Sequence, residues 1–422
     1  MKVLIVGGGG REHAIAMSVS KSSKVTQLFC APGNAGIANY ATCVPIKPMD
    51  FDEIRAFSLE EQIDLVVVAM DDPLVAGLVD VLEAANIRAF GPNKAAAIIE
   101  GSKTFAKDLM KKYEIPTAEY QAFKESNAAL EYVHQATHPV VIKADGLALG
   151  KGVYICSTVE ESEVAIAEIM LDRRFGDAGT SIVIEEYMTG REVSVLAFVD
   201  GTTIKTMSSA QDHKRVGDGD TGPNTGGMGV FSPSPYYTKE IDVYCQRVIF
   251  KPTVDAMKQE GREFKGVLYF GLMMTEMGPK VVEYNARFGD PEAQVILPRL
   301  QNDIIDVFFA CMDGTLDQLD LEFSDQAAVG VVLASAGYPA SYHTGTYITG
   351  LELFQSTEDV LCFHAGTAYN EEGQLVTNGG RVFCITALAR DLKAARERAY
   401  EACKWVEFDG KYQRSDIGIA FL

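Results

Sequence analysis

Residues 211–229 read QDHKRVGDGDTGPNTGGMG, and no other stretch of the chain is as informative. Its nineteen residues combine cationic side chains, carboxylates, amides and six glycines. Because glycine is unfavourable inside helices and strands, this composition predicts an irregular loop that forms neither. Apolar, strand-like runs flank the loop, which argues against disorder. Backbone N–H groups and mixed charge suit a small zwitterion or a phosphoryl group in transfer. A solvated surface loop is the alternative interpretation.

The length and composition of the chain are those of an ordinary globular protein with about two to four domains. Its 422 residues carry a formal net charge of −20, which leaves no positive field to attract nucleic acid or an anionic membrane. The eight cysteines form no C-x-x-C pair, so we expect reduced thiols and a cytoplasmic location rather than disulfides or a zinc site. No apolar run approaches the roughly 18 residues of a membrane-spanning helix.

Residues 1–100 alternate short apolar runs with helical stretches. Strands are expected at residues 2–6, 26–31, 65–69 and 88–90. Continuous Val, Ile and Leu runs between helices are typical of a parallel sheet that is covered on both faces. Ligands of such sheets lie at the carboxyl ends of the strands, so this edge is the expected binding site.

Four glycines at residues 7–10 join the first strand to a helix and are followed by Arg11, Glu12 and His13. Free N–H groups at a helix N-terminus attract anions. A dinucleotide fingerprint would need a glycine where Glu12 or His13 stands, and no acidic residue ends the second strand to hold a ribose. A smaller sugar phosphate is therefore the expected ligand. A turn that serves only helix–sheet packing is the alternative.

Residues 143–153 read KADGLALGKGV, a glycine loop with two lysines between two strands. The backbone donors of such a loop can fold over triphosphate oxygens. The loop is not a P-loop, because the G-x-x-x-x-G-K-[ST] spacing is absent. Further on, a strand at residues 182–186 leads through EEYM at 185–188 to Glu192. Its main-chain groups can bind a base and its carboxylates a ribose, and a charged strand end is the alternative.

Residues 280–292 read KVVEYNARFGDPE, in which Glu283 and Asn285 alternate with apolar residues. Both side chains therefore point to one face of a strand. Two oxygen ligands whose shell is completed by phosphates suit Mg²⁺, which takes few protein ligands. Arg287, two residues further on, can clamp a carboxylate or phosphate with two hydrogen bonds. A solvated polar face is the alternative.

Taken in this order, the motifs resemble the ATP-grasp superfamily and, at finer resolution, the glycinamide ribonucleotide synthetases (phosphoribosylamine–glycine ligases). The matching segments are GGREH at 9–13, PGNAG at 32–36, DGLALGKGV at 145–153, EEY and GREVSV within 185–195, the 211–229 loop and EYNARFGDPE at 283–292. The resemblance implies an α/β fold with an N-terminal doubly wound parallel sheet, a two-part ATP-grasp module and a small, strand-rich C-terminal domain. The expected ranges are 1–100 for a sugar-phosphate domain, 101–120 with 191–325 for the central ATP-grasp domain, 121–190 for its lid and 326–422 for the C-terminal domain.

The resemblance also implies a reaction. A family member joins glycine to 5-phosphoribosylamine through a glycyl phosphate while ATP, bound with Mg²⁺ or Mn²⁺, becomes ADP and phosphate. Such an enzyme acts on small molecules, with neither nucleic acid nor membrane as a partner, and a monomer or weak dimer is expected. Lid closure is expected to keep water away from the acyl phosphate.

The site residues carried over from the family fall into four groups. ATP is expected to bind Lys103, Lys143, Gly146, Gly150, Lys151, Gly152, Glu185, Glu186, Tyr187, Met188 and Glu192. Glycine and the sugar phosphate are expected to bind Gly9, Gly10, Arg11, Glu12, Pro32, Gly33, Asn34, Asp71, Asp212, Asn224, Thr225, Gly226, Gly227, Met228, Arg287, Gly289 and Asp290. The metal is expected at Glu283 and Asn285. Catalytic roles are expected for Asp212, His213, Lys214 and Arg287, with His213 as a candidate base or as a residue that orients its loop.

One segment departs from the family pattern. Ala69, Met70 and Asp71 stand where the family has Gly-Pro-Glu, so the carboxylate is one methylene shorter. This departure puts the affinity for the sugar phosphate in question and leaves the reaction class unchanged. Two other functions compete with this assignment. Ligases that activate bicarbonate or formate lack the 211–229 loop, and a non-catalytic nucleotide sensor would not need the metal pair.

Overall fold

The structure is a computed structural model that describes residues 1–148 and 150–419. Its N-terminal part is a parallel sheet in the order β3-β2-β1-β4-β5, which confirms the predicted doubly wound sheet. The strands are β1 (Lys2–Gly7), β2 (Gln27–Pro32), β3 (Thr42–Cys43), β4 (Leu65–Val68) and β5 (Ala89–Phe90). The helices are α1 (Gly10–Ser20), α2 (Phe51–Glu60), α3 (Asp71–Ala76), α4 (Leu78–Ala84) and α5 (Lys94–Gly101).

The apolar run of β1 fixes the layers of this sheet. Successive side chains of a strand point to opposite faces. Val3 and Ile5 accordingly lie in one hydrophobic core, whereas Leu4 and Val6 lie in the other. The strand is therefore buried on both faces, and the polar loops that follow β1, β2 and β4 meet at one edge.

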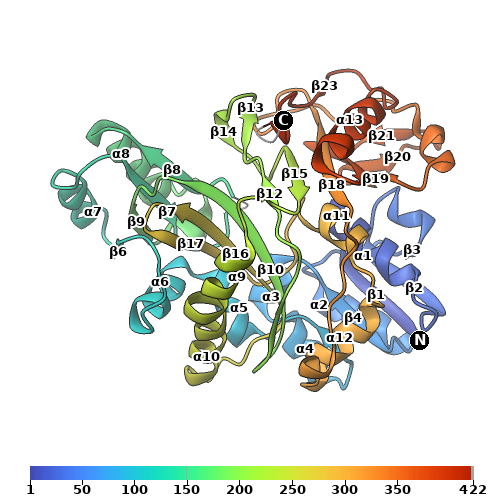
Figure 1. Ribbon diagram of the computed structural model, residues 1–422, viewed down its shortest axis with the longest axis horizontal. Coiled ribbons are helices and arrows are strands. Elements are labelled where there is room, and N and C mark those ends of the chain that lie inside the picture. The colour runs from blue at the N-terminus through green and yellow to red at the C-terminus, as the bar shows by residue number, and fades with distance from the viewer. Residues whose placement is uncertain (149, 420–422) are drawn as a thin grey trace.

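A separate antiparallel sheet in the order β6-β9-β7-β8 forms what we call the lid unit. Its strands are β6 (Tyr120–Phe123), β7 (Val140–Ala144), β8 (Val153–Cys156) and β9 (Ile182–Glu186), covered by α7 (Ser126–Val133) and α8 (Val159–Ile166). A π-helical turn, Ala167–Leu171, continues α8. The unit has its own core and lies at the far left of Figure 1, joined to the rest through α6 (Lys103–Lys112).

The central sheet is antiparallel, in the order β11-β10-β16-β17. Its strands are β10 (Arg191–Asp200), β11 (Ile204–Thr206), β16 (Lys265–Thr275) and β17 (Gly278–Asn285), and its helices are α9 (Lys239–Cys245), α10 (Lys251–Gln259), α11 (Ala293–Ile296) and α12 (Ile304–Asp313). Residues from Val193 to Asp200 of β10 are all buried, because the strand packs against both large cores. This sheet places β17 beside the lid unit (Figure 1).

The C-terminal sheet draws strands from two parts of the chain. Its order is β12-β15-β18-β22-β19, with β23 paired to β18. The bounds are β12 (Gln211–Asp212), β15 (Gly229–Ser232), β18 (Ala327–Ser335), β19 (Val360–His364), β22 (Arg381–Ala389) and β23 (Lys411–Tyr412). The hairpin β20 (Thr367–Tyr369) and β21 (Leu375–Thr377) and the helix α13 (Leu392–Cys403) complete what we call the C-terminal unit. Residues 211–212 and 229–232 thus join this sheet although they fall within 191–325, and the four domain ranges stay predictions.

The prediction that residues 211–229 contain no strand is wrong. Between β12 and β15 the chain forms a two-stranded hairpin of β13 (Arg215–Gly217) and β14 (Thr221–Asn224), which we call the hairpin. Its turn is Asp218-Gly219-Asp220, where both Gly219 and Asp220 have positive φ. Three of the six glycines therefore serve a turn and a bulged ladder, which composition alone does not distinguish from a loop.

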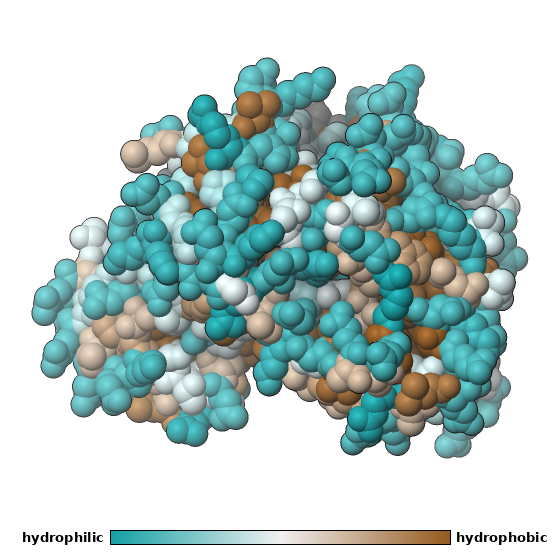
Figure 2. Space-filling view, turned by 90° about the horizontal axis from the view of Figure 1, so that it is seen from below, coloured by the Kyte–Doolittle hydropathy of each residue, from teal (hydrophilic) through white to brown (hydrophobic). Residues whose placement is uncertain are grey.

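Figure 2 shows one face of the molecule, coloured by hydropathy. This face is largely hydrophilic, and its outline is indented at the lower edge. Figures 1 and 2 share their horizontal axis, so the lid unit lies at the left of both views. Across the residues that the structure describes, no helix is long and apolar enough to cross a membrane.

Replacing Phe308 by alanine is expected to destabilise the fold. Phe308 on α12 is fully buried and stacks on Phe90 of β5, with ring centroids 4.0 Å apart. Truncating such a ring costs about 3–5 kcal/mol of unfolding free energy, since the cavity closes only in part. Thermal unfolding followed by circular dichroism should show a midpoint several degrees lower. Val243→Ala, at a side chain that is 68% exposed, is the control and should leave the midpoint unchanged.

Candidate active site

The glycine turn at residues 7–10 is closed by carboxylates. Glu12 accepts a hydrogen bond from the Gly9 amide (2.6 Å) and pairs with Arg11 (Nε–Oε1 2.6 Å). The Arg11 amide donates to Asp290 Oδ2 (3.4 Å), and the buried Arg11 guanidinium donates to Phe288 O (3.2 Å). Two of the N–H groups at the helix N-terminus are thus held by side chains, and the turn is tied to the segment that follows β17.

The segment Pro32-Gly33-Asn34 packs directly on this turn. A Cβ atom on Gly8 would lie 2.5 Å from Gly33 O, so the two backbones can approach only because Gly8 has no side chain. Asn34 Nδ2 donates to Gly8 O (2.9 Å) and to His364 O (2.9 Å). The ends of β1 and β2 therefore meet the C-terminal unit.

His13 links α1 to the same strand. The His364 amide donates to His13 Nδ1 at 2.8 Å. Burial, together with the neighbouring His364, lowers the pKa of His13 to about 3. The neutral ring accepts this hydrogen bond, so His13 serves the joint between the N-terminal sheet and the C-terminal unit.

Arg287 lies between two carboxylates. Its Nη2 is 2.9 Å from Glu100 Oε1 and 3.9 Å from Asp71 Oδ2. Burial raises the pKa of Glu100 to about 7, against the opposing effect of Arg287. For Asp71, burial also opposes ionisation, but Arg287 and Arg11 hold its pKa below the usual value. Asn285 Oδ1 is 3.4 Å from the same Nη2, so the pair at residues 283 and 285 adjoins this cluster.

Three lysines surround Glu283. Lys214 lies 3.4 Å from Glu283 and 2.8 Å from Glu192. Lys214 lowers the pKa of Glu283 to about 2, with Lys143 and Lys103 adding to the effect and burial opposing it. Lys103 also donates to Gly146 O at 3.0 Å. This region therefore gathers positive charge around one permanently ionised carboxylate.

Glu185 is buried among cations. Its Oε2 lies 3.0 Å from Lys143 and 3.1 Å from Lys107, while Oε1 has no hydrogen-bond partner among the described residues. Glu186 instead pairs with Lys280 at 3.0 Å near the surface. Tyr187 and Met188 follow at the open end of β9, with Tyr187 42% exposed.

The glycine loop of the lid unit contacts the C-terminal unit. Gly146 packs against the backbone of Ala178, where a Cβ atom would lie 2.9 Å from its Cα. Lys151 Nζ donates to Pro339 O at 3.4 Å, in the C-terminal unit. Gly150 is exposed and Gly152 is buried, whereas Leu149 lies outside the described residues.

Asp212 and His213 lie at the base of the hairpin. Burial and Glu292 raise the pKa of Asp212 well above its usual value, and its Oδ1 has no partner in the described part of the chain. Gly227 must be a glycine here, because a Cβ atom would lie 2.6 Å from that oxygen. The His213 ring packs edge-on to Phe231, and burial together with Arg414 lowers its pKa.

The segment that follows β14 is fixed by the C-terminal unit. The Gly226 amide donates to the Tyr338 hydroxyl (3.0 Å), and Arg381 Nη1 donates to Gly226 O (2.6 Å). Arg381 also pairs with Asp290 (3.2 Å). Asn224 and Thr225 lie at the end of the hairpin, Met228 is buried, and Gly289 packs on Glu292.

Sequence reasoning missed several residues that line this site. They are Glu100, Lys107, Glu292, Tyr338, His364 and Arg381. For Lys107 a signal existed, because its i, i+4 spacing from Lys103 places both lysines on one face of α6. Arg381 and His364 stand at the ends of apolar strands far along the chain, where nothing in the local pattern marks them.

Comparisons with known proteins identify the family to which this chain is similar. Models of phosphoribosylglycinamide synthetase match residues 1–100 (N domain), 101–293 (ATP-grasp domain) and 328–420 (C domain). The phosphoribosylamine–glycine ligase of Caldanaerobacter subterraneus subsp. tengcongensis is 47% identical over 421 residues, covering 100% of each chain. The crystal structure of the phosphoribosylamine–glycine ligase of Thermotoga maritima has a TM-score of 0.84 at 34% identity, covering 99% of this chain and 100% of that one. A biotin carboxylase domain of Hydrogenobacter thermophilus, with magnesium ADP, has a TM-score of 0.76 at 17% identity over 97% of this chain and 91% of that one, a likeness of fold alone.

Replacing Glu100 by glutamine is expected to change how stability depends on pH. Between pH 4.5 and about 7 the folded protein keeps a proton on Glu100 that the unfolded chain has released. The free energy of unfolding therefore falls through this interval, by about 3 kcal/mol from this one group. Glutamine does not titrate, so Glu100→Gln should gain about that much relative to the wild type between about pH 5 and about pH 8.

Urea unfolding at both pH values measures this difference. Glu83→Gln, at an exposed position on α4, is the matched control and should differ from the wild type equally at both pH values. A Glu100→Gln difference that does not move with pH would contradict the assignment of a raised pKa to Glu100.

Proposed function

Because the chain belongs to the phosphoribosylglycinamide synthetase family, we propose specific roles for its residues in joining glycine to 5-phosphoribosylamine. The chain is an ATP-grasp carbon–nitrogen ligase of purine biosynthesis that forms glycinamide ribonucleotide, ADP and phosphate through a glycyl phosphate. Ligases of this class use ATP with a divalent metal ion.

The glycine zwitterion is proposed to bind between Arg287 and Asp212. Arg287 Nε is a buried donor and Asp212 Oδ1 a buried acceptor, and within the described residues neither has a partner. Burial and Glu292 raise the pKa of Asp212. Burial opposes a raised pKa at Arg287, where Glu100, Asp71 and Glu292 outweigh it, so the charge of Glu292 acts on both groups. An unpaired buried donor and acceptor of this kind suit a carboxylate and an ammonium group. This pair of unsatisfied atoms carries the proposal.

The ATP phosphates are proposed to bind among Lys103, Lys143 and Lys214, under the loop at residues 146–152. Lys143 is buried and Lys103 and Lys214 are partly buried, so these cations can neutralise the charge that builds up during phosphoryl transfer. Glu283, which stays ionised, and Asn285 offer neighbouring oxygen ligands that fit Mg²⁺ or Mn²⁺. The metal would supply charge neutralisation on the phosphates.

The nucleoside is proposed to lie along β9 and β10. Oε1 of Glu185 is buried without a partner among the described residues, so it can accept a hydrogen bond from a ligand amine. The half-exposed segment at 186–188 leaves room beside it for a base, and Glu192 is placed for the ribose. In the present geometry Glu192 pairs with Lys214, which would then turn toward phosphate.

The phosphoribosylamine is proposed to bind where β1, β2 and β4 end. Residues 7–10 and 32–34 are packed together there, and Asp71 follows β4 at the same edge. His213 stays the candidate base for the amine, since its low pKa keeps the ring neutral and Nδ1 has no partner within the described residues. The alternative role of His213 is to orient the 211–229 loop.

We also propose a cytoplasmic location and a monomeric or weakly dimeric state. All eight cysteines are free thiols, most of them buried, which is usual for a protein of a reducing compartment. The acidic net charge of −20 supports small molecules, not nucleic acid or membrane, as partners.

Consumption of ATP should depend on every substrate. Purified protein with ATP, a divalent metal, glycine and freshly generated phosphoribosylamine is expected to form glycinamide ribonucleotide, and omission of any component should stop it. Mass spectrometry of the product and release of phosphate measure the reaction. ATP consumption that is indifferent to glycine, or that requires bicarbonate or formate, would contradict the proposed substrate.

Restoring the longer side chain with Asp71→Glu is expected to act on the sugar phosphate. Asp71 lies at the edge of the sheet where phosphoribosylamine is proposed to bind. Its Oδ2 is 3.9 Å from Nη2 of Arg287. The variant should therefore change KM for phosphoribosylamine several-fold, by about 1 kcal/mol of binding energy, while KM for ATP stays nearly constant. Initial rates with each substrate varied in turn measure both constants. Equal changes in the two KM values would remove Asp71 from the sugar-phosphate site.

A further inference from the structure

The two strands of the hairpin are too short to keep its geometry without other contacts. Strands β13 and β14 are three and four residues long, and in the described part of the chain they pair with no further strand. The register is interrupted between Arg215 and Gly217, and residues 218–223 are exposed. An isolated two-stranded hairpin is marginal in water, so the contacts that order this one must come from elsewhere.

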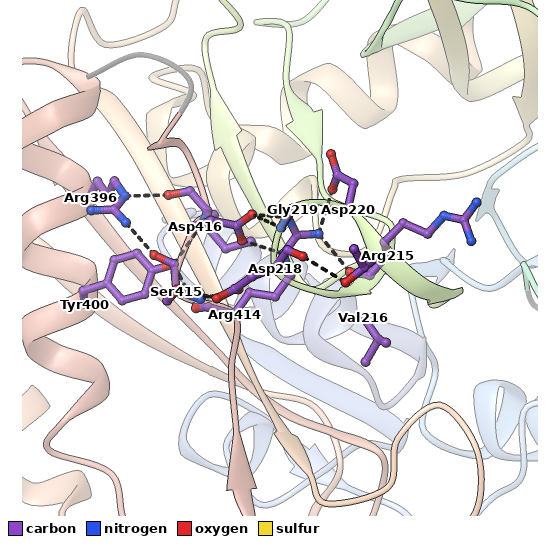
Figure 3. A network of polar contacts seen from close by, with 12 residues as sticks. Arg215, Val216, Asp218, Gly219, Asp220, Arg396, Tyr400, Arg414, Ser415 and Asp416 are labelled. Carbon is purple, nitrogen blue, oxygen red and sulfur yellow. Dashed lines mark hydrogen bonds and ion pairs between the residues drawn. The ribbon is translucent and has the colours of Figure 1, made fainter.

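Those contacts come from residues 412–416, near the end of the described chain. Arg414 Nη1 donates to Arg215 O (2.9 Å) and pairs with Asp220 (2.8 Å). Asp416 accepts from the Gly219 amide at 2.8 Å. Figure 3 shows Arg414 and Asp416 lying between α13 and the turn of the hairpin.

Two residues close to Arg414 form further hydrogen bonds with the hairpin. The Ser415 amide donates to Asp218 Oδ1 at 2.8 Å, and the Ser415 hydroxyl donates to the other oxygen of Asp218. The Tyr412 hydroxyl donates to Val216 O at 2.8 Å. Every residue of the hairpin from 215 to 220 except Gly217 is thus held by this segment.

Arg414 is the centre of this cluster. Its side chain is 1% exposed, and its Nε and Nη2 form a two-pronged pair with Asp416, both at 2.7 Å. The planar guanidinium can serve Asp416, Asp220 and a carbonyl at once, which the single ammonium of lysine cannot do with the same geometry.

The segment that carries Arg414 is itself fixed to α13. Arg396 donates to Ile417 O (2.8 Å) and to Ser415 O (2.6 Å), and the Tyr400 hydroxyl donates to Arg414 O (2.9 Å). The rigid body at this end of the network is therefore the helix and sheet of the C-terminal unit (Figure 3).

At its other end the hairpin carries the residues proposed to bind glycine and phosphate. Thr225 donates through both its amide (2.7 Å) and its hydroxyl (2.8 Å) to Lys214 O, which closes the base of the hairpin. Lys214 in turn pairs with Glu192 and Glu283 on the central sheet. A tilt of the hairpin would shift Lys214 and Asn224, at its base, relative to the metal pair.

We propose that Arg414 is a positioning residue that holds the hairpin, and with it the glycine-binding loop, in its binding geometry. Arg414 touches no proposed substrate position and acts through Asp220, Asp416 and the backbone of Arg215. The assignment of glycine to this loop rests on the proposed function, whereas the mechanical role of Arg414 rests on the contacts alone.

The test compares Arg414→Lys with Arg390→Gln, a matched control on the same unit whose arginine is 88% exposed and pairs only with its neighbour Asp391 in the described residues. Two readouts are needed. One is the set of kcat and KM values for glycine, for ATP and for phosphoribosylamine. The other is backbone hydrogen exchange over residues 213–226 in the ligand-free protein, a readout that does not depend on any reaction.

For Arg414→Lys we expect KM for glycine and KM for ATP to rise about tenfold, because Asn224 and Lys214 move with the hairpin, while KM for phosphoribosylamine changes little. Amides at 215–225 should exchange about tenfold faster. Arg390→Gln should match the wild type. A second variant, Asp218→Asn with Asp220→Asn, removes only exposed hairpin partners and should act in the same direction, even if Arg414→Lys fails to fold.

Wild-type exchange and wild-type KM for glycine in both variants would overturn the proposal. Faster exchange combined with equal changes in all KM values would make Arg414 a purely structural residue, which also overturns it. A wild-type protein whose ATP consumption ignores glycine would instead refute the proposed function, and the exchange data would still report on the hairpin.

Discussion

The need to pair every buried charge organises this molecule. Removing a charge from water is costly unless an opposite charge or hydrogen bonds replace the water. Lys107 of α6 meets Glu185 of β9, and Arg287 meets Glu100 of α5. The partly buried Lys214 of the loop meets Glu192 of β10 and Glu283 of β17. These pairs join segments that lie apart along the chain, whereas Arg11–Glu12 and Arg414–Asp416 are local pairs. Charge pairing therefore fixes how the separate sheets meet, and it concentrates cations at one place in a chain of net charge −20.

Features that depend on neighbouring residues could be predicted from the sequence. The apolar run of β1 and the glycines after it specify a buried parallel strand and a tight turn, because side-chain alternation and helix ends are local. The strand with Glu283 and Asn285 was predicted for the same reason, and β17 ends at Asn285. The roles assigned to the site residues stay predictions.

Features that depend on partners far along the chain could not be predicted. The hairpin looked like a loop because its glycines and aspartates are turn formers, and its order depends on Arg414, almost 200 residues further on. Arg381 likewise reaches Asp290 and Gly226 from a strand whose sequence shows only apolar alternation. Sequence periodicity reports which face of an element is buried, but it carries no information on what lies opposite.

The C-terminal unit contacts three of the segments that we propose to bind substrates. It contacts the N-terminal turn through His364 and Asn34, the substrate loop through Arg381 and Arg414, and the lid loop through the carbonyl of Pro339 and Lys151. An acyl phosphate hydrolyses when water reaches it, so the three binding segments must enclose it together. Because the C-terminal unit contacts all three segments, it fixes their positions relative to one another. Without it, each segment would be placed only by the flexible backbone that joins it to the next.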